Sequence, residues 1–355
     1  AGFATALTYG TLRLRGRYDA MIAACTDRPL ERIDQAVLDV LRLGGHQLMG
    51  MRVAQHAAVS TTVDLATTSC GRGAATFVNA VMRRLSGRDL DSWMDELRRD
   101  APDETSALAR TQSHPEWIVK ALRQALVTHG RSGEELEVLL AADNADPEVA
   151  LCARPGLIAP EALAKAARKA DRAHDVEPRP GRISPLAVVM VGGDPGRIEA
   201  IRDCRAGVED EGSQLVALVA AHAPVEGRDA RWLDLCAGPG GKAALLAARA
   251  AQTGAQLLAN EVSPHRADLV RSALRAIAPD VARVRCGDGR DLGRDEPGAY
   301  DRVLVDAPCT GLGSLRRRPE ARWRRQPQDV TVLAELQREL LASALRAVRR
   351  GGVVT

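Results

Sequence analysis

The sequence predicts a multidomain protein in which an all-α helical bundle is followed by a small α/β connector and then by an α/β domain with a parallel sheet. Its 355 residues are enough for two or three domains of ordinary size. Apolar residues recur with a helical period through residues 1–128, whereas strand and helix patterns alternate over residues 212–355. The mixed patterns of residues 129–211 indicate the connector.

Composition excludes several classes of protein. Hydrophobic residues make up 45% of the chain and charged residues 27%, and no apolar run is long enough to cross a bilayer. We therefore expect neither a membrane protein nor a fibrous or disordered one. The seven cysteines form no C-x-x-C pair, so we expect a reducing, cytoplasmic location and no metal site. The net charge of +3 does not by itself indicate a nucleic-acid partner.

The first 128 residues carry a series of apolar stripes. Between residues 31 and 50, Ile33, Val37 and Leu41 fall on one helix face, and Gly44-Gly45 is expected to break that helix. Further stripes predict helices over residues 57–65, 77–85, 90–97 and 117–126. Short polar or glycine-bearing turns separate these helices, which is typical of a helical bundle.

The connector contains both helix and strand signals. A polar helix is predicted up to Leu140, a strand over 149–154 and a helix over 161–170. Proline and glycine interrupt the rest, most densely at 192–196.

The last region reads as repeating strand and helix units. Strands are predicted over 232–236, 256–260, 282–286 and 300–306 and from Val353 onward, and helices over 242–251, 264–276 and 329–348. Alternation of this kind produces a Rossmann-like parallel sheet with right-handed crossovers, in which ligands bind beyond the carboxyl ends of the strands. We therefore expect the chemistry to lie just after each strand.

A glycine-rich turn follows the first strand of this region. Its residues are Cys236, Ala237, Gly238, Pro239, Gly240, Gly241 and Lys242. Glycines let a backbone approach a ligand, and the helix that follows presents free N–H groups. A triphosphate cradle is excluded, because Cys236 stands where the first glycine is needed and Ala243 replaces the hydroxyl residue that would hold magnesium. A nucleotide-like ligand without a triphosphate is favoured.

Acidic residues follow the second and third strands. Glu261 comes 20 residues after Gly241, the spacing at which a doubly wound fold places a carboxylate on a ribose. Asp288 follows the third strand. A tight turn would also explain the glycines and a helix-start acid would explain Glu261, but the alignment of three such features favours a ligand site.

The fourth strand is followed by Asp306-Ala307-Pro308-Cys309. A carboxylate and a thiol on a proline-stiffened turn form a candidate reaction centre. A cysteine alone is more often a small buried hydrophobe, but Cys309 lies in a polar, glycine-flanked loop.

An arginine-rich segment comes next. It holds Arg316, Arg317, Arg318, Arg322, Arg324 and Arg325 against the single acid Glu320, with Trp323 among them. Guanidinium groups suit a phosphate backbone and a tryptophan can stack on a base. We expect an RNA-binding segment, because the one-signed charge counts against an ordinary solvated face.

At this point the chain resembles the bacterial RNA cytosine-5 methyltransferases of the Sun/Fmu/RsmB type, which modify 16S ribosomal RNA. The stretch 233–242 is similar to the family's S-adenosylmethionine loop, Asn260-Glu261 with Arg266 to its ribose-binding segment, Gly287-Asp288 to its adenine-side acid, and 306–309 to its base-contacting motif. The stretch 209–214 looks like the start of the catalytic domain. Residues 41–44, 77–85 and 114–117 resemble the family's NusB-like RNA-binding domain.

The resemblance implies an activity. S-adenosylmethionine would be the cofactor, Asp306 would contact both cofactor and base, and the enzyme would act on RNA as a monomer. A thiolate would add to C6 of cytosine so that C5 can take the methyl group. The family's nucleophilic cysteine lies a few residues beyond a turn that here is Gly351-Gly352, so we expect it just beyond Thr355, and Cys309 would help release the product. Both ends of the chain look cut.

Two alternatives stay open at this level. A non-catalytic RNA-binding or antitermination protein would explain the helical region, but it has no use for acids at successive strand ends. An amino-group methyltransferase would need an Asp/Asn-Pro-Pro-aromatic turn in place of residues 306–309.

Overall fold

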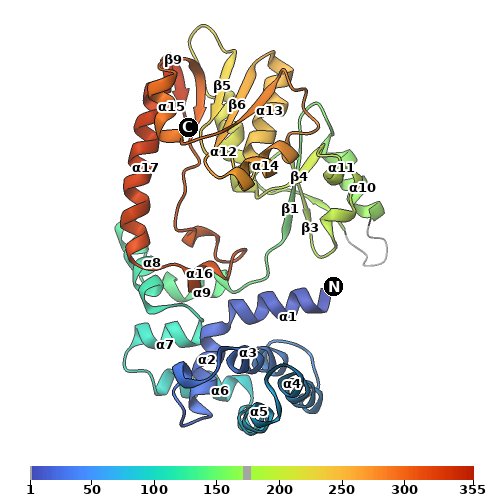
Figure 1. Ribbon diagram of the computed structural model, residues 1–355, viewed down its shortest axis with the longest axis vertical. Coiled ribbons are helices and arrows are strands. Elements are labelled where there is room, and N and C mark those ends of the chain that lie inside the picture. Colours follow the sequence, from blue (N-terminus) through green and yellow to red (C-terminus); the bar gives the residue numbers. More distant parts are fainter. Residues whose placement is uncertain (1, 171–176) are drawn as a thin grey trace. The chain divides into compact units, whose positions relative to one another are not determined.

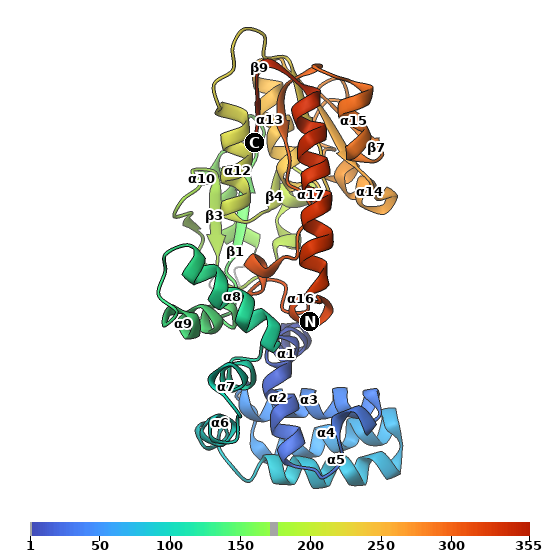
Figure 2. The ribbon, with the colours of Figure 1, turned by 90° about the vertical axis from the view of Figure 1, so that its left-hand side faces the viewer.

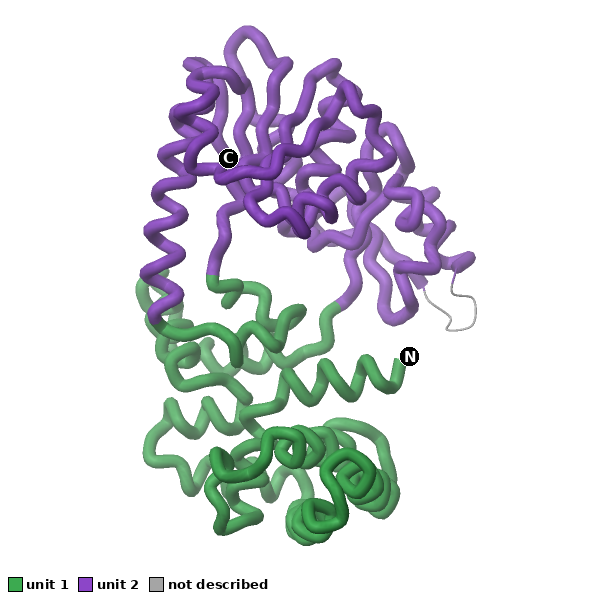
Figure 3. Tube along the Cα trace, in the orientation of Figure 1, with its two compact units in different colours: residues 1–147, 310–327 green, residues 148–309, 328–355 purple. Residues whose placement is uncertain are grey.

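The computed structural model describes residues 2–170 and 177–355. The chain forms two compact units, which Figure 3 shows in separate colours. The helical unit contains residues 1–147 and 310–327, and the sheet unit contains residues 148–309 and 328–355. The predicted helical region therefore ends at Pro147 rather than at residue 128, and a segment distant in sequence belongs to it.

Amphipathic helices build the helical unit. Their bounds are α1 (Gly2–Arg13), α2 (Arg15–Ala24), η1 (Leu30–Arg32), α3 (Gln35–Met49), α4 (Gln55–Cys70), α5 (Arg72–Leu85), α6 (Leu90–Arg99), α7 (Glu104–Thr111), α8 (Glu116–Thr128) and α9 (Glu135–Asp143), with η4 (Leu312–Ser314) and α16 (Ala321–Arg324) from the later segment. Helices α3, α4 and α5 lie side by side (Figure 2). Their apolar faces bury Leu41, Met82 and Trp93 in one core.

Helix α3 continues through Gly44-Gly45, so the predicted break there is wrong. A Cβ atom at Gly44 would lie 2.7 Å from the side chains of Met82 and Thr62, and one at Gly45 would lie 3.3 Å from Tyr18. The two glycines therefore permit close helix packing. At the start of this helix, Asp34 is the N-cap residue, because its carboxylate accepts a hydrogen bond from the Ala36 N–H group.

The connector forms a small antiparallel sheet within the sheet unit. Its strands β1 (Val149–Ala153), β2 (Arg179–Pro180), β3 (Ala187–Met190) and β4 (Ala206–Val208) lie in the order β2-β3-β1-β4. Helices α10 (Pro160–Ala170) and α11 (Glu199–Arg202) and the short η3 (Pro195–Arg197) accompany them. Leu151, Leu163 and Val188 share a core of their own.

The main sheet of this unit is parallel throughout. In the described residues its strands are β5 (Arg231–Asp234), β6 (Gln256–Glu261), β7 (Ala282–Cys286), β8 (Tyr300–Leu304) and β9 (Val348–Val354), in the order β7-β6-β5-β8-β9. The helices are α12 (Glu211–His222), α13 (Gly241–Thr253), α14 (Pro264–Ala273), α15 (Gly289–Asp295) and α17 (Gln328–Ala347) (Figure 1). This is the Rossmann-like arrangement that the alternating pattern predicts.

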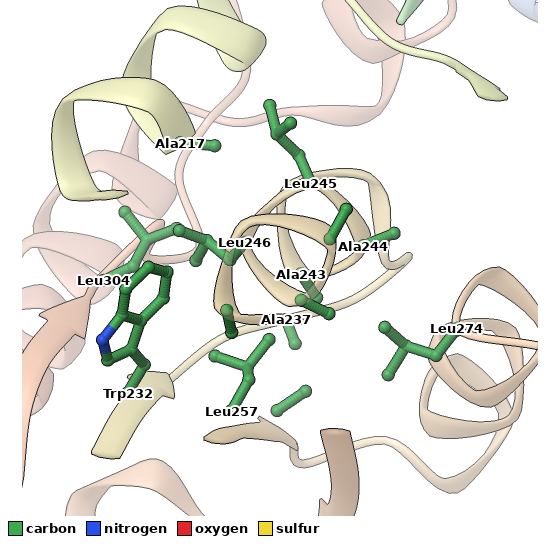
Figure 4. Packing of buried hydrophobic residues seen from close by; sticks show 14 of the residues in the cluster. Ala217, Trp232, Ala237, Ala243, Ala244, Leu245, Leu246, Leu257, Leu274 and Leu304 are labelled. Atoms are coloured by element: carbon green, nitrogen blue, oxygen red, sulfur yellow. The ribbon is translucent and has the colours of Figure 1, made fainter. Parts of the chain in front are cut away.

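Helices cover both faces of this sheet. Trp232 of β5 packs with Leu246 of α13 and Leu257 of β6 in the cluster shown in Figure 4. The next residue along β5, Leu233, faces the opposite side and packs with Leu340 of α17. Successive side chains of a strand point to opposite faces, so each central strand is buried on both sides. Its functional side chains are consequently found at its ends.

Candidate functional site

The loops at the carboxyl edge of the parallel sheet bring the predicted cofactor residues together. The glycine turn connects β5 to α13, and the turn requires glycine at positions 238 and 240. A Cβ atom at Gly238 would lie 2.3 Å from an Oε atom of Glu261. Gly240 adopts a φ of +113°, which favours glycine, and a Cβ atom there would collide with the side chain of Ala273. The turn therefore runs directly against the end of β6.

Glu261 organises this contact. Its side chain is 3% exposed, and its two carboxylate oxygens accept hydrogen bonds from the N–H groups of Gly238 and Ser263, each at 3.0 Å. Arg266 lies 3.6 Å from the same carboxylate and donates to the carbonyl oxygen of Gly238. Glu261 and Arg266 thus form one network with the glycine turn, while a ribose contact for Glu261 stays a prediction.

Asn260 belongs to the stretch that resembles the ribose-binding segment, and the structure gives its side chain a role that the motif did not specify. Its side-chain amide donates to the carbonyl oxygens of Leu235 at 3.1 Å and Gly287 at 3.0 Å. It therefore fastens together the loops that follow β5, β6 and β7. Its position directly before Glu261 is the signal that could have identified this role.

Asp288 and Cys236 lie on opposite sides of Asn260 in this network of loops. Asp288 caps α15 by accepting from the N–H group of Arg290, and hydrogen bonds from the Arg290 side chain lower the pKa of its carboxyl. Burial raises the pKa of the Cys236 thiol to about 12, and the charge of Asp234 adds to this effect. Cys236 is therefore a neutral thiol in the wall of the turn, not a nucleophile.

Lys242 and Asp306 form the most direct charged contact of the site. The Nζ atom of Lys242, in the first turn of α13, lies 2.9 Å from a carboxylate oxygen of Asp306 beyond β8. The lysine side chain is 17% exposed and that of Asp306 is 54% exposed. The carboxylate of Asp306 therefore stays accessible to a ligand, while its ion pair with the mostly buried lysine fixes its position.

Two further acids act on this pair. Burial raises the pKa of Asp234 to about 7, although the backbone N–H group of Cys236 opposes the shift and the charge of Asp306 adds to it. Burial likewise raises the pKa of Glu209 to about 7, with the charge of Lys242 opposing it. Glu209 precedes α12 by two residues and reaches the site only through the fold, so no local spacing could reveal it.

Cys309 is exposed and shares its turn with Asp306. The carbonyl oxygen of Pro308 accepts a hydrogen bond from the side chain of Gln337 at 2.8 Å, which anchors the turn to α17. The structure therefore places the predicted carboxylate and thiol on one anchored loop at the carboxyl edge of the sheet.

The arginine segment does not belong to this edge. It is part of the helical unit, and Arg322 is fully buried there. Its guanidinium donates to the carbonyl oxygens of Arg13, Ser113 and Asp143 and to the side-chain oxygen of Asn144. The predicted RNA contact of Arg322 is therefore wrong, because the side chain is fully buried and both of its terminal nitrogens donate to oxygens of the helical unit.

Trp323 is engaged in the same way. Its Nε1–H group donates to the carbonyl oxygen of Leu12 at 2.7 Å, and the guanidinium of Arg15 lies 5.4 Å from its ring centroid. The indole is half-buried, and its RNA contact stays a prediction. RNA contacts of Arg316, Arg317, Arg318, Arg324 and Arg325 stay predictions.

Two other features are absent from residues 2–170 and 177–355. No group of three or more histidine, cysteine, aspartate or glutamate side chains is arranged to hold a metal ion. No helix in that part of the chain is long and apolar enough to span a membrane.

Comparisons with known proteins identify both halves of the chain. A family profile described as 16S rRNA methyltransferase RsmB/F matches residues 220–355, and the NusB family profile matches residues 1–87. The ribosomal RNA small subunit methyltransferase B of Pseudomonas putida is 32% identical over 356 residues, covering 99% of this chain and 76% of that protein. A Mycobacterium tuberculosis protein, whose given name assigns it to the methyltransferases without a substrate, is 52% identical over 355 residues, covering the whole chain and 74% of that protein.

Solved structures agree on the fold. The crystal structure of PH0851 superposes with a TM-score of 0.80 at 19% identity, covering 99% of this chain and 75% of that one. NSun6 of Pyrococcus horikoshii, solved with SFG, gives a TM-score of 0.54 at 16% identity, covering 68% of this chain and 82% of that one. The catalytic and NusB-like halves are thus present in one chain, and the non-catalytic alternative is excluded: the chain belongs to the RsmB/F family of rRNA methyltransferases.

Proposed function

We propose that this protein transfers a methyl group from S-adenosylmethionine to C5 of a cytosine in 16S rRNA through a covalent cysteine adduct. One observation carries the proposal: the Asp306–Cys309 turn, with Asp306 held by Lys242 at 2.9 Å, follows β8 at the same sheet edge as the network of Glu261 and the glycine turn. A base-holding carboxylate and a thiol are thus paired with a nucleotide-type site on one rigid sheet.

The residues present fit the cofactor. Gly238 leaves no room for a Cβ atom beside Glu261 and Arg266, so the turn lies directly against the two residues expected to position the ribose. Carboxylates at three strand ends, Glu261, Asp288 and Asp306, supply acceptors for ribose hydroxyls and negative charge for a sulfonium. Glu261 and Arg266 would position the ribose and Asp288 the adenine side. When bound, S-adenosylmethionine supplies an electrophilic methyl group.

The chemistry of cytosine defines what the chain must do. C5 is too weak a nucleophile to accept a methyl group unaided, so a cysteine thiolate adds to C6 and makes C5 enamine-like. Asp306 accepts hydrogen bonds from the exocyclic amine and from N3 once the adduct protonates there, which stabilises the adduct. After methyl transfer, a base takes the C5 proton, the electron pair of the C5–H bond restores the C5–C6 double bond, and the C6–S bond breaks to return the thiolate.

The base must also be reachable. A cytosine within a duplex hides C5 and C6 in the stack, so the target must be unpaired or extruded. Asp306, with its 54% exposed side chain, suits such a base because it combines access with a fixed position.

The modified position is tested in cells. We expect 16S rRNA from cells lacking the gene to lose one 5-methylcytosine, mapped by bisulfite sequencing, and to regain it on complementation with the wild-type gene but not with Asp306→Ala. An rRNA map identical with and without the gene would refute the 16S assignment.

The adduct is tested through Cys309. We propose that the attacking cysteine follows Thr355 and that Cys309 assists release. A Cys309→Ala enzyme, incubated with RNA and S-adenosylmethionine, should then show a slowly migrating protein–RNA band on a denaturing gel, together with methylated RNA. Cys286→Ala, at another exposed cysteine, is the matched control and should show no such band. Loss of both band and methylation in Cys309→Ala would make Cys309 the nucleophile.

A further inference from the structure

The segment 310–327 connects two strands of the sheet unit but folds as part of the helical unit (Figure 3). The chain leaves the sheet unit directly after Cys309 and returns to it at Gln328. A connection between neighbouring strands of a parallel sheet usually stays on its own domain. What holds this one in the helical unit is a buried polar network.

Arg322 is the centre of that network. It is the largest cation among the fully buried side chains, and burial lowers the pKa of its guanidinium to about 10. Four oxygens of three separate parts of the helical unit accept from it: Arg13 at 3.1 Å, Ser113 at 2.9 Å, and Asp143 and Asn144 at 3.2 and 2.9 Å. Both terminal nitrogens of this buried guanidinium are thus hydrogen-bonded, which offsets much of the cost of burying its charge.

Contacts on both sides of Arg322 extend the network. The side chain of Arg13 donates to the carbonyl oxygen of Arg316 at 3.3 Å and pairs with Asp146 at 2.5 Å. Trp323 lies so close to α2 that a Cβ atom at Gly16 would come within 2.6 Å of its ring. The segment is therefore docked at the α1–α2 junction along much of its length.

Positive charge gathers at this junction. Residues 1–17 contain three arginines and no acid, and residues 310–327 contain six arginines and one acid. These 35 residues carry a net charge of +8, whereas the whole chain carries +3, so the remaining 320 residues carry −5. Asp146 pairs with Arg13 and Asp19 pairs with Arg15, so with these two acids a net charge of +6 remains where the segment docks.

We propose that the α1–α2 junction and the docked segment form one composite surface for the RNA phosphate backbone, in which Arg322 is a positioning residue. Arg318 and Arg324 are exposed on the segment, and the side chain of Arg15 is 34% exposed beside it. Arg322 itself touches no phosphate; it fixes the backbone from which the others project. This inference rests on the RNA substrate proposed above and adds the surface that receives its backbone.

The salt dependence of RNA binding separates a positioning residue from a contact residue. Each phosphate contact contributes about 0.7 to 0.9 to the slope of log K against log salt concentration. Arg318→Met should lower the slope by the contribution of about one phosphate contact. Arg322→Met should lower the slope by the contribution of about two contacts or more, and it should weaken RNA binding at least roughly tenfold. The probe is an unmodified 16S rRNA transcript, measured by filter binding from low to moderate salt. Arg99→Met, an exposed arginine of α6, is the matched control and should change nothing.

Folding is checked in the same samples. Arg322→Met should keep the circular dichroism spectrum and the S-adenosylmethionine affinity of the wild type. If it unfolds, Trp323→Phe replaces it, since this variant keeps a ring but loses the bond to Leu12 and should shift the slope in the same direction. A slope change of only one contact, or none, in the variant used would overturn the inference. Wild-type protein that binds the transcript without salt dependence would instead overturn the proposed RNA substrate.

Discussion

A buried aspartate has a lowered pKa at the amino edge of the parallel sheet and a raised pKa at the carboxyl edge. Asp301, near the start of β8, and Asp234, at the end of β5, are 0% and 1% exposed. The pKa of Asp301 is lowered to about 2, whereas that of Asp234 is raised to about 7. Equal burial thus gives opposite electrostatic outcomes on adjacent strands.

Hydrogen-bond donors explain the amino edge. Burial alone would raise the pKa of Asp301, but the N–H groups of Ala230 and Arg231, at 2.8 Å each, and the guanidinium groups of Arg349 and Arg228 outweigh it. This carboxylate ties the start of β5 to β8 and β9. Its charge is fully used within the fold, which is the mark of a structural group.

The carboxyl edge keeps its acids poorly compensated. Asp234 has the charges of Asp306 and Glu209 nearby, and one lysine, Lys242, opposes them. Such a site stores electrostatic free energy that a cationic ligand can release. Burial alone therefore identifies neither role, whereas the hydrogen-bond donors around each carboxylate identify both.

The largest expected effect is at the amino edge. Asp301→Ala leaves two arginines and two N–H groups without their acceptor, so it should lower the free energy of unfolding by about 3–5 kcal/mol in urea denaturation. Asp268→Ala, which removes an exposed acid of α14, is the control and should cost less than about 1 kcal/mol. Because the folded pKa lies below the ordinary value, the stability due to Asp301 is present above about pH 4 and lost as the pH falls toward 2. If Asp301→Ala and Asp268→Ala lowered the free energy of unfolding equally, Asp301 would not be the structural group that distinguishes the amino edge.

The second effect has the opposite sign. Asp234 in the folded protein keeps a proton that the unfolded chain has released, so its contribution to stability falls as the pH rises from about 4 to 7. Asp234→Asn should therefore be more stable than the wild type at pH 8, by roughly 2–4 kcal/mol, with little difference at pH 4. Thermal unfolding at both pH values measures this, with Asp301→Asn as the counterpart that loses stability at pH 8. Destabilisation by Asp234→Asn at pH 8 would mean that the carboxylate is ionised and satisfied.

The smallest effect concerns binding. Glu261→Ala should weaken S-adenosylmethionine by roughly 1.5–3 kcal/mol, the range for hydrogen bonds to a charged group, as read by calorimetry. Glu296→Ala, at an exposed acid near the other edge that pairs with Arg231, should leave the affinity unchanged. Unchanged affinity in Glu261→Ala would restrict that residue to holding the glycine turn.

Local patterns predicted most of the elements. Helical periodicity and strand alternation indicated both domain types, and the strand over 282–286 agrees residue for residue with β7. The break predicted at Gly44-Gly45 was wrong because those glycines serve contacts with Met82, Thr62 and Tyr18, which lie outside any local window. Glycine signals a turn only when the backbone needs its freedom, and tertiary packing decides whether it does.

The sequence alone located the side chains of the carboxyl edge, because a parallel sheet aligns its strand ends and the residues that follow each strand can be read in order; their chemical roles stay predictions. Glu261, Asp288, Asp306 and Cys309 were found in this way. Only the tertiary fold brings Glu209 near Lys242, and only the fold places the Arg322 guanidinium against oxygens of Arg13, Ser113 and Asn144, about two to three hundred residues away in the chain. A guanidinium that binds phosphate and one that is buried against carbonyl oxygens have the same sequence signal, since their difference lies in partners that only the fold supplies.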